Sequence, residues 1–243
     1  MIRHHPEDEW LVALAAGRAD GGQGLLLAVH LETCATCRAR LHTLQAVGGD
    51  LLAAIEPAPM AATALDATLA RLDAPASALA ATASPVAVPV SPIAAPASPR
   101  AARPVAAAVS PPDRPPLADG VEWPASLRHC GISRWHWMGP GMRWSRVTLP
   151  YASPGALFLL KIPPGRSLPS HTHRGIELTQ VLCGSFHDGR SLFGPGDFDA
   201  TDEDVHHQPV VRPGEICVCL AYVGGRLAFD GWAASAIGRS IGM

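Results

Sequence analysis

The sequence has no long uninterrupted apolar run and no strong excess of charge of either sign. Its most apolar stretch, residues 79–112, contains a proline every few residues, which excludes a membrane-spanning helix. The formal net charge of −2 gives no general attraction to nucleic acids or to membrane surfaces. The first residues, MIRHHPEDEW, carry charges and a proline where a signal peptide would have an apolar run. We therefore expect a soluble, cytoplasmic protein.

The sequence is also poor in cysteine, and its cysteines do not form a disulfide framework. Two close pairs and two isolated residues account for all six: Cys34 with Cys37, Cys217 with Cys219, Cys130 and Cys183. In a cytoplasmic protein such residues are metal ligands or free thiols more often than disulfides.

The composition changes twice along the chain, which predicts three parts. Residues 1–73 are acidic and helical in pattern. Residues 74–118 are almost entirely Ala, Pro, Ser and Val, with too little bulky apolar surface to offset their ordering entropy, so they predict a linker. Residues 119–243 contain short β-like runs separated by Gly and Pro, as in an all-β barrel or sandwich. The expected fold class is multidomain α plus all-β.

Three candidate metal ligands lie among the predicted helices, which cover residues 8–16, 24–32, 35–55 and 63–73. His30 and Cys34 are one helical turn apart, and Cys37 follows Cys34 by three positions at a helix start. All three side chains can therefore converge on one ion. A closed structural zinc site needs a fourth ligand, and the N-terminus offers His4 or His5.

Two other interpretations of the Cys-x-x-Cys pair are a chance pairing and a redox dithiol. The redox motif usually follows a strand in a βαβ pattern, which this segment lacks, so the nearby histidine favours zinc. Residues 1–73 hold five Arg against nine Asp plus Glu, the wrong sign for a zinc finger that reads DNA. A protein partner is the better expectation.

These residues carry a resemblance to a known family. The arrangement His5-x24-His30-x3-Cys34-x2-Cys37, followed by RAR, resembles the zinc-binding anti-sigma fold, a small helical domain that wraps a bacterial sigma factor. The resemblance covers residues 1–73, and its spacing implies His5 rather than His4 as the ligand.

A second candidate metal site lies in the segment GRSLPSHTHRGIELTQVLCG. On a strand, His171 and His173 point to the same face, and Glu177 begins the next strand and can face the same cavity. Two imidazoles and a carboxylate suit a divalent metal with exchangeable positions. Three polar side chains on a solvated loop are the alternative, which the flanking Gly and Pro residues disfavour.

This spacing looks like the first motif of the cupin family, which usually adds a histidine from a second motif. Here a Pro195-Gly196-Asp197 turn precedes the adjacent residues His206 and His207. If residues 204–209 form a strand, only one of the two can face inward. We favour His207. Cys217 and Cys219 share one strand face, either as buried structural thiols or as a thiol pair that faces the cavity and senses an oxidant.

The whole chain outside the linker resembles the ChrR-type anti-sigma factors, in which a helical zinc domain precedes a cupin domain. The segments HLETCATCRARL, HTHRGIELT and CVCLA carry this resemblance. It implies a regulator, not an enzyme, that sequesters an extracytoplasmic-function sigma factor and releases it on oxidative, notably singlet-oxygen, stress. It also implies Zn²⁺ on the first ligand set and a second divalent metal, expected to be Zn²⁺, on the cupin set with His207.

The sequence alone leaves two questions open. A metal-dependent cupin enzyme, such as a dioxygenase with an accessory zinc domain, is the alternative function, and a storage or sugar-binding cupin is a further one. Two sets of apolar helix residues are either sigma contacts or internal core: Trp10, Leu11 and Leu14, and Leu65, Leu69 and Leu72.

Overall fold

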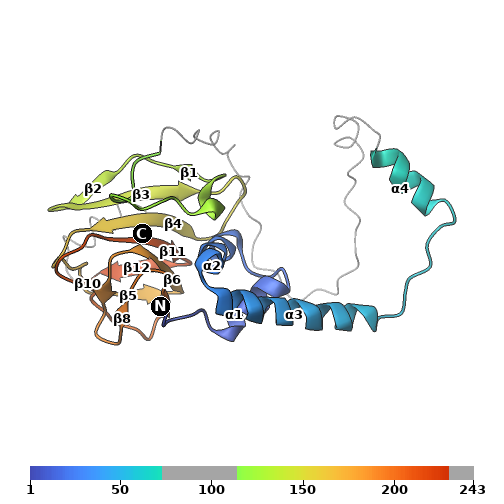
Figure 1. Ribbon diagram of the computed structural model, residues 1–243, viewed down its shortest axis with the longest axis horizontal. Helices are drawn as coiled ribbons and strands as arrows, with labels where there is room; N and C mark the ends of the chain where they lie inside the picture. Colours follow the sequence, from blue (N-terminus) through green and yellow to red (C-terminus); the bar gives the residue numbers. More distant parts are fainter. Residues whose placement is uncertain (73–113, 230–243) are drawn as a thin grey trace. The chain divides into compact units, whose positions relative to one another are not determined.

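The computed structural model describes residues 1–72 and 114–229, which divide into two compact units. The first unit combines residues 1–49 with residues 114–229, and the second holds residues 50–72 (Figure 1). Most of the expected linker, residues 74–113, lies outside the described residues, and the expected domain boundaries stay a prediction. No helix in the described ranges is long and apolar enough to cross a membrane.

Four helices occupy the expected positions: α1 (Asp8–Ala15), α2 (Gly21–Thr33), α3 (Ala35–Ala53) and α4 (Ala64–Leu72). Helix α2 begins with a capping box, in which the Asp20 carboxylate accepts hydrogen bonds from the amides of Gly22 and Gln23. Helix α1 ends before Gly17, whose φ of 65° lies in the left-handed region. Helix α3 continues through Gly48 and Gly49 without a break.

Residues 131–229 form an antiparallel β-sandwich, which confirms the expected fold class. Its largest sheet has seven strands: β1 (Gly131–Ile132), β2 (His136–Gly139), β3 (Met142–Thr148), β4 (Ala156–Ile162), β6 (Glu177–Cys183), β9 (Phe198–Thr201) and β11 (Cys217–Val223). The strand order is β1-β3-β4-β11-β6-β9, with β2 paired to β3 in a hairpin that contains Trp137 and Trp144. Smaller sheets join β7 (Phe186–His187) to β8 (Leu192–Phe193) and β10 (Val210–Val211), and β5 (His171–Arg174) to β12 (Arg226–Phe229).

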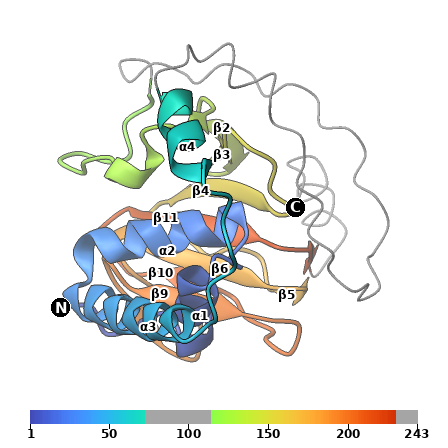
Figure 2. The same cartoon turned by 90° about the vertical axis from the view of Figure 1, so that its right-hand side faces the viewer.

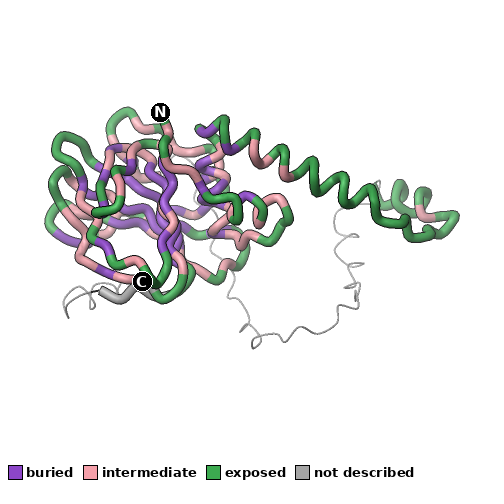
Figure 3. Tube along the Cα trace, turned by 90° about the horizontal axis from the view of Figure 1, so that it is seen from below, coloured by how far each residue is buried: buried purple, intermediate pink, exposed green. Residues whose placement is uncertain are grey.

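The central strands of the large sheet are buried on both faces. In β4, Phe158 and Leu160 belong to the cluster inside the sandwich, whereas Leu157 and Leu159 belong to a second cluster on the outer face. Burial on both faces explains why this strand is a continuous apolar run rather than an alternating one. Figure 3 shows these central strands buried and most of α3 exposed.

The outer face of the sheet packs against the N-terminal helices. Helix α2 lies across β6 and β11 (Figure 2), and its Leu26 and Leu27 are fully buried in the same cluster as Leu220 of the sheet. The Glu32 carboxylate at the end of α2 accepts hydrogen bonds from the amides of Ala125 and Ser126. We call residues 114–229 the β-domain; within it Leu117, a residue of the expected linker, is fully buried.

The two sets of apolar helix residues differ in exposure, which answers one open question. Leu11 is fully buried, and Trp10 and Leu14 pack partly buried against the same core. The α4 leucines are exposed: Leu65 (68%), Leu69 (49%) and Leu72 (76%). The first set is therefore internal core, and the second set is a free apolar face.

Candidate metal centres

The first candidate centre brings together His5, His30, Cys34 and Cys37, each with one ligand atom, and all four atoms lie within 4.8 Å of one another. His5 precedes α1, His30 lies on α2, and the two cysteines flank the start of α3. The Nδ1 atom of His5 is 3.3 Å from the Cys34 sulfur and 3.4 Å from the Cys37 sulfur. The junction of the three helices thus forms a pocket of two imidazoles and two thiols.

His4 points elsewhere. Its ring packs against Phe193, with the ring centroids 4.5 Å apart. Of the two N-terminal histidines, the structure brings only His5 to the cysteines.

The electrostatics of this pocket fit a bound cation. Burial and the neighbouring Cys34 thiol raise the pKa of Cys37 to about 11, so the Cys37 sulfur needs a positive charge nearby to ionise. Burial lowers the pKa of His30, which keeps its imidazole neutral and able to ligate. The Nε2 atom of His30 is buried and has no hydrogen-bond partner among the described residues. A metal would satisfy it, and two thiolates with two imidazoles suit tetrahedral zinc.

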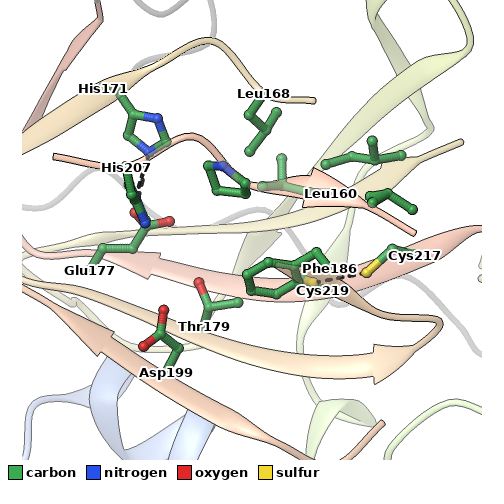
Figure 4. Close-up of a pocket in the computed structure, with 13 residues that line it drawn as sticks. Leu160, Leu168, His171, Glu177, Thr179, Phe186, Asp199, His207, Cys217 and Cys219 are labelled. Atoms are coloured by element: carbon green, nitrogen blue, oxygen red, sulfur yellow. Dashed lines mark hydrogen bonds and ion pairs between the residues drawn. The ribbon is translucent and has the colours of Figure 1, made fainter. Parts of the chain in front are cut away.

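The second candidate centre lines a cavity inside the sandwich (Figure 4). His171 begins β5, Glu177 begins β6, and His207 pairs with His171 through a single β-bridge. The Nε2 atoms of the two histidines are 3.2 Å apart, and a Glu177 oxygen is 3.7 Å from that of His171. The side chain of the fourth expected ligand, His173, lies outside what the structure describes.

The structure distinguishes the two adjacent histidines of the second motif by their burial. His207 is buried, whereas His206 is exposed and its ring contacts the Ser170 hydroxyl at 3.2 Å. No strand covers residues 204–209, however, so the inward turn of His207 comes from the bridge to His171 rather than from regular strand alternation.

The outer nitrogens of the two cavity histidines face acceptors. His171 Nδ1 lies 2.8 Å from the Pro169 carbonyl, and His207 Nδ1 lies 3.6 Å from the Asp188 carboxylate. The Pro169 carbonyl places the ring proton of His171 on Nδ1, which leaves its Nε2 lone pair directed toward His207. Two imidazoles and a carboxylate that converge in this way fit a divalent metal.

A third group of possible metal ligands consists of Asp188, Asp199 and His207, but an arginine rather than a metal explains why they lie together. Arg190 lies between the carboxylates, with its Nε 2.7 Å from Asp188 and its Nη2 2.8 and 3.0 Å from the Asp199 oxygens. The guanidinium already forms ion pairs with both carboxylates, so Asp188 acts as an outer partner of His207 rather than as part of another metal site. Sequence analysis missed Asp188, because no spacing rule links it to a histidine so far along the chain.

The cavity is small and partly lined by thiols. Its volume is about 30 Å³, and the Cys217 and Cys219 sulfurs on its wall are 3.6 Å apart. A hydrogen bond with Cys217 and burial raise the pKa of the Cys219 thiol well above its usual range. This volume has room for an ion and about two waters, whereas ligand pockets are roughly ten times larger.

Comparison with known proteins agrees with this arrangement. Residues 126–225 match the ChrR cupin-like domain family. The anti-sigma-E factor ChrR of Cereibacter sphaeroides is 36% identical over 230 residues, which are 94% of this chain and 93% of that protein. A crystal structure of Rhodobacter sphaeroides SigE in complex with the anti-sigma ChrR matches with a TM-score of 0.64 and 32% identity, covering 92% of this chain and 99% of that chain. The chain belongs to the ChrR family of anti-sigma factors.

Proposed function

We propose that this protein is a cytoplasmic anti-sigma factor, which binds an extracytoplasmic-function sigma factor through residues 1–73 and keeps it from RNA polymerase. The observation that carries the proposal is the similarity along nearly the whole length of both chains to a ChrR protein solved in complex with SigE. The cavity set lies within residues 126–225, which match the ChrR cupin-like domain family.

The exposed face of α4 is the contact that we assign to the sigma factor. Leu65, Leu69 and Leu72 recur at the spacing of one helix face, and none of the nine α4 residues is buried. A helix of this length is marginal alone in water, so its apolar face gains stability by packing into an apolar groove of a partner. Four apolar residues that precede α4 in the chain are also exposed: Val47, Leu51, Leu52 and Ile55.

The two metal sites have different roles in this proposal. Zn²⁺ on His5, His30, Cys34 and Cys37 is structural, because it joins the three helix ends that carry the ligands. A second divalent metal, which we expect to be Zn²⁺, is held by His171, His173, Glu177 and His207. This β-domain site senses oxidative stress of the singlet-oxygen type, and a change in the metal site releases the sigma factor.

A metal-dependent cupin enzyme, such as a dioxygenase, is the alternative function. The small cavity opposes it, because the described lining residues leave no room for an organic substrate beside a metal ion. Substrate turnover that needs His171 and Glu177 would reverse this preference.

A binding experiment tests the proposal. The full chain is co-expressed with an extracytoplasmic-function sigma factor encoded beside its gene, and copurification and sigma-dependent transcription are measured. We expect a stable complex and inhibited transcription, which Leu65→Asp/Leu69→Asp should abolish. The matched control Ala67→Asp/Ala70→Asp places the same two charges on the opposite, exposed face of α4 and should retain both. A folded, zinc-loaded full chain that leaves transcription unchanged would refute the anti-sigma function.

A further inference from the structure

The imidazole of His30 contacts a side chain of the β-domain. Its Nδ1 atom lies 3.1 Å from the Oε1 atom of Gln180 on β6, and the two residues are 0% and 2% exposed. The Gln180 amide nitrogen donates to the Val181 carbonyl at 3.2 Å, which turns the amide oxygen toward His30. Because that oxygen can only accept, the His30 proton lies on Nδ1 and the Nε2 lone pair is directed at the metal pocket.

The chain next to His5 is also held by the β-domain. The Asp197 carboxylate, only 3% exposed, accepts hydrogen bonds from the amides of Arg3 (2.6 Å) and His4 (3.0 Å). The amide of Phe198 donates to the His4 carbonyl at 3.1 Å. The second oxygen of Asp197 is fixed by the Gly194 amide at 2.8 Å, so the carboxylate itself is firmly placed. These bonds set where the chain enters the pocket at His5.

We infer that Gln180 and Asp197 are positioning residues of the N-terminal zinc site, so that the β-domain raises the affinity of that site for metal. The inference rests on the zinc site proposed above. The β-domain contacts His30 directly and holds the chain beside His5, whereas both cysteines flank the start of α3. Loss of such an outer partner typically weakens metal binding by about 10- to 100-fold.

The position of Gln180 on β6 also connects the two candidate metal centres. Glu177, a candidate ligand of the cavity site, lies three residues earlier on the same strand. An odd separation places the two side chains on opposite faces of the sheet, Glu177 toward the cavity and Gln180 toward α2. One strand therefore carries a ligand of one site and the outer partner of the other.

Cobalt titration of the full chain tests the inference, because thiolate-to-cobalt absorption reports the cysteine-containing site apart from the His/Glu site. Affinity for zinc follows from competition against bound cobalt. We expect Gln180→Ala and Asp197→Ala each to weaken binding at this site by about 10- to 100-fold. Gln180→Glu keeps an acceptor oxygen and should recover most of the affinity. Gln45→Ala on the exposed surface of α3 and Asp202→Ala on an exposed turn are the matched controls and should bind as the wild type does.

The outcomes separate this inference from the site on which it rests. A wild-type chain without a thiolate–cobalt band would refute the zinc site and the inference together. A wild-type band with equal affinity in folded Gln180→Ala would refute the inference alone. If the variants do not fold, long-range ¹H–¹⁵N correlation on the zinc-loaded wild type decides. A proton on Nδ1 of His30 with the metal on Nε2 supports the inference, and coordination through Nδ1 overturns it.

Discussion

The hydroxyl of Tyr222 donates a 2.6 Å hydrogen bond to the carboxylate of Asp20, the residue that caps helix α2. The other oxygen of that carboxylate accepts from the amides of Gly22 and Gln23. Burial and the neighbouring Asp20 raise the pKa of Tyr222, so the phenol stays protonated and donates. A single carboxylate thus starts the helix that carries His30 and binds it to strand β11.

Replacing Tyr222 by Phe should weaken this junction. A hydrogen bond to a charged acceptor contributes about 1.5–3 kcal/mol, and Tyr222→Phe removes it while keeping the ring. We expect a loss of that size in the free energy of unfolding of the full chain, measured in urea. Tyr151→Phe, at an exposed position, is the control and should change stability little. Equal effects of the two variants would show that the hydrogen bond contributes nothing.

Two glycines of α2 should respond in opposite directions to alanine. A Cβ at Gly22 would clash with the Tyr222 ring, whereas a Cβ at Gly24 would meet no atom within 4 Å. Gly22→Ala should therefore destabilise the full chain by about 1–3 kcal/mol through overpacking. Gly24→Ala should stabilise it by up to about 1 kcal/mol, since alanine is the better helix former. Thermal unfolding of both variants measures the difference, and shifts of the same sign would argue against close packing of α2 on β11.

Local patterns of the sequence were sufficient to predict the helices and several of the strands. The helices were predictable from apolar spacing and from stops such as Gly17, and the β2–β3 hairpin from alternating tryptophans around a Gly-Pro-Gly turn. The packing of α2 on the sheet was not predictable in this way. It depends on pairs such as Asp20 with Tyr222 and His30 with Gln180, which are far apart in the chain and individually ordinary.

The candidate sites show the same difference between residues that local patterns predict and residues that only the folded chain brings together. Three residues of the N-terminal set were selected from spacing and His5 from the family resemblance, and the structure brings all four together. The side chain of Gln180, which contacts His30, was missed, because a glutamine on a strand carries no sign of the histidine that it faces. Their assignment as metal ligands stays a prediction, which metal analysis can test.

Metal content should follow the two ligand sets independently. We expect about two equivalents of metal per chain by elemental analysis, because each set has ligands for one ion. Cys34→Ser should lose one equivalent and lower the unfolding temperature of the full chain, since a metal bound there would join three helix ends. Removing the metal with a chelator should have the same effect. A wild-type content near one equivalent would eliminate one of the two sites.

The adjacent histidines of the β-domain offer a matched pair. His207 is buried in the cavity beside His171, whereas His206 is exposed at the surface. His207→Ala should therefore remove the second equivalent of metal, and His206→Ala should retain it. Metal loss in His206→Ala with retention in His207→Ala would exclude the ligand set proposed here.

The separation of binding from sensing gives the last prediction. The apolar face assigned to the sigma factor lies on α4, and the cavity ligands lie inside the sandwich, so a change in the cavity should leave partner binding intact. We expect His171→Ala/Glu177→Ala to copurify with the sigma factor as the wild type does, but to release it poorly under singlet-oxygen challenge. Glu203→Ala, an exposed acidic residue, is the control and should release it normally. Normal release by the double variant would place sensing outside the cavity metal. Metal-dependent oxygen consumption with a small-molecule substrate, lost in the double variant, would instead identify the β-domain as an enzyme.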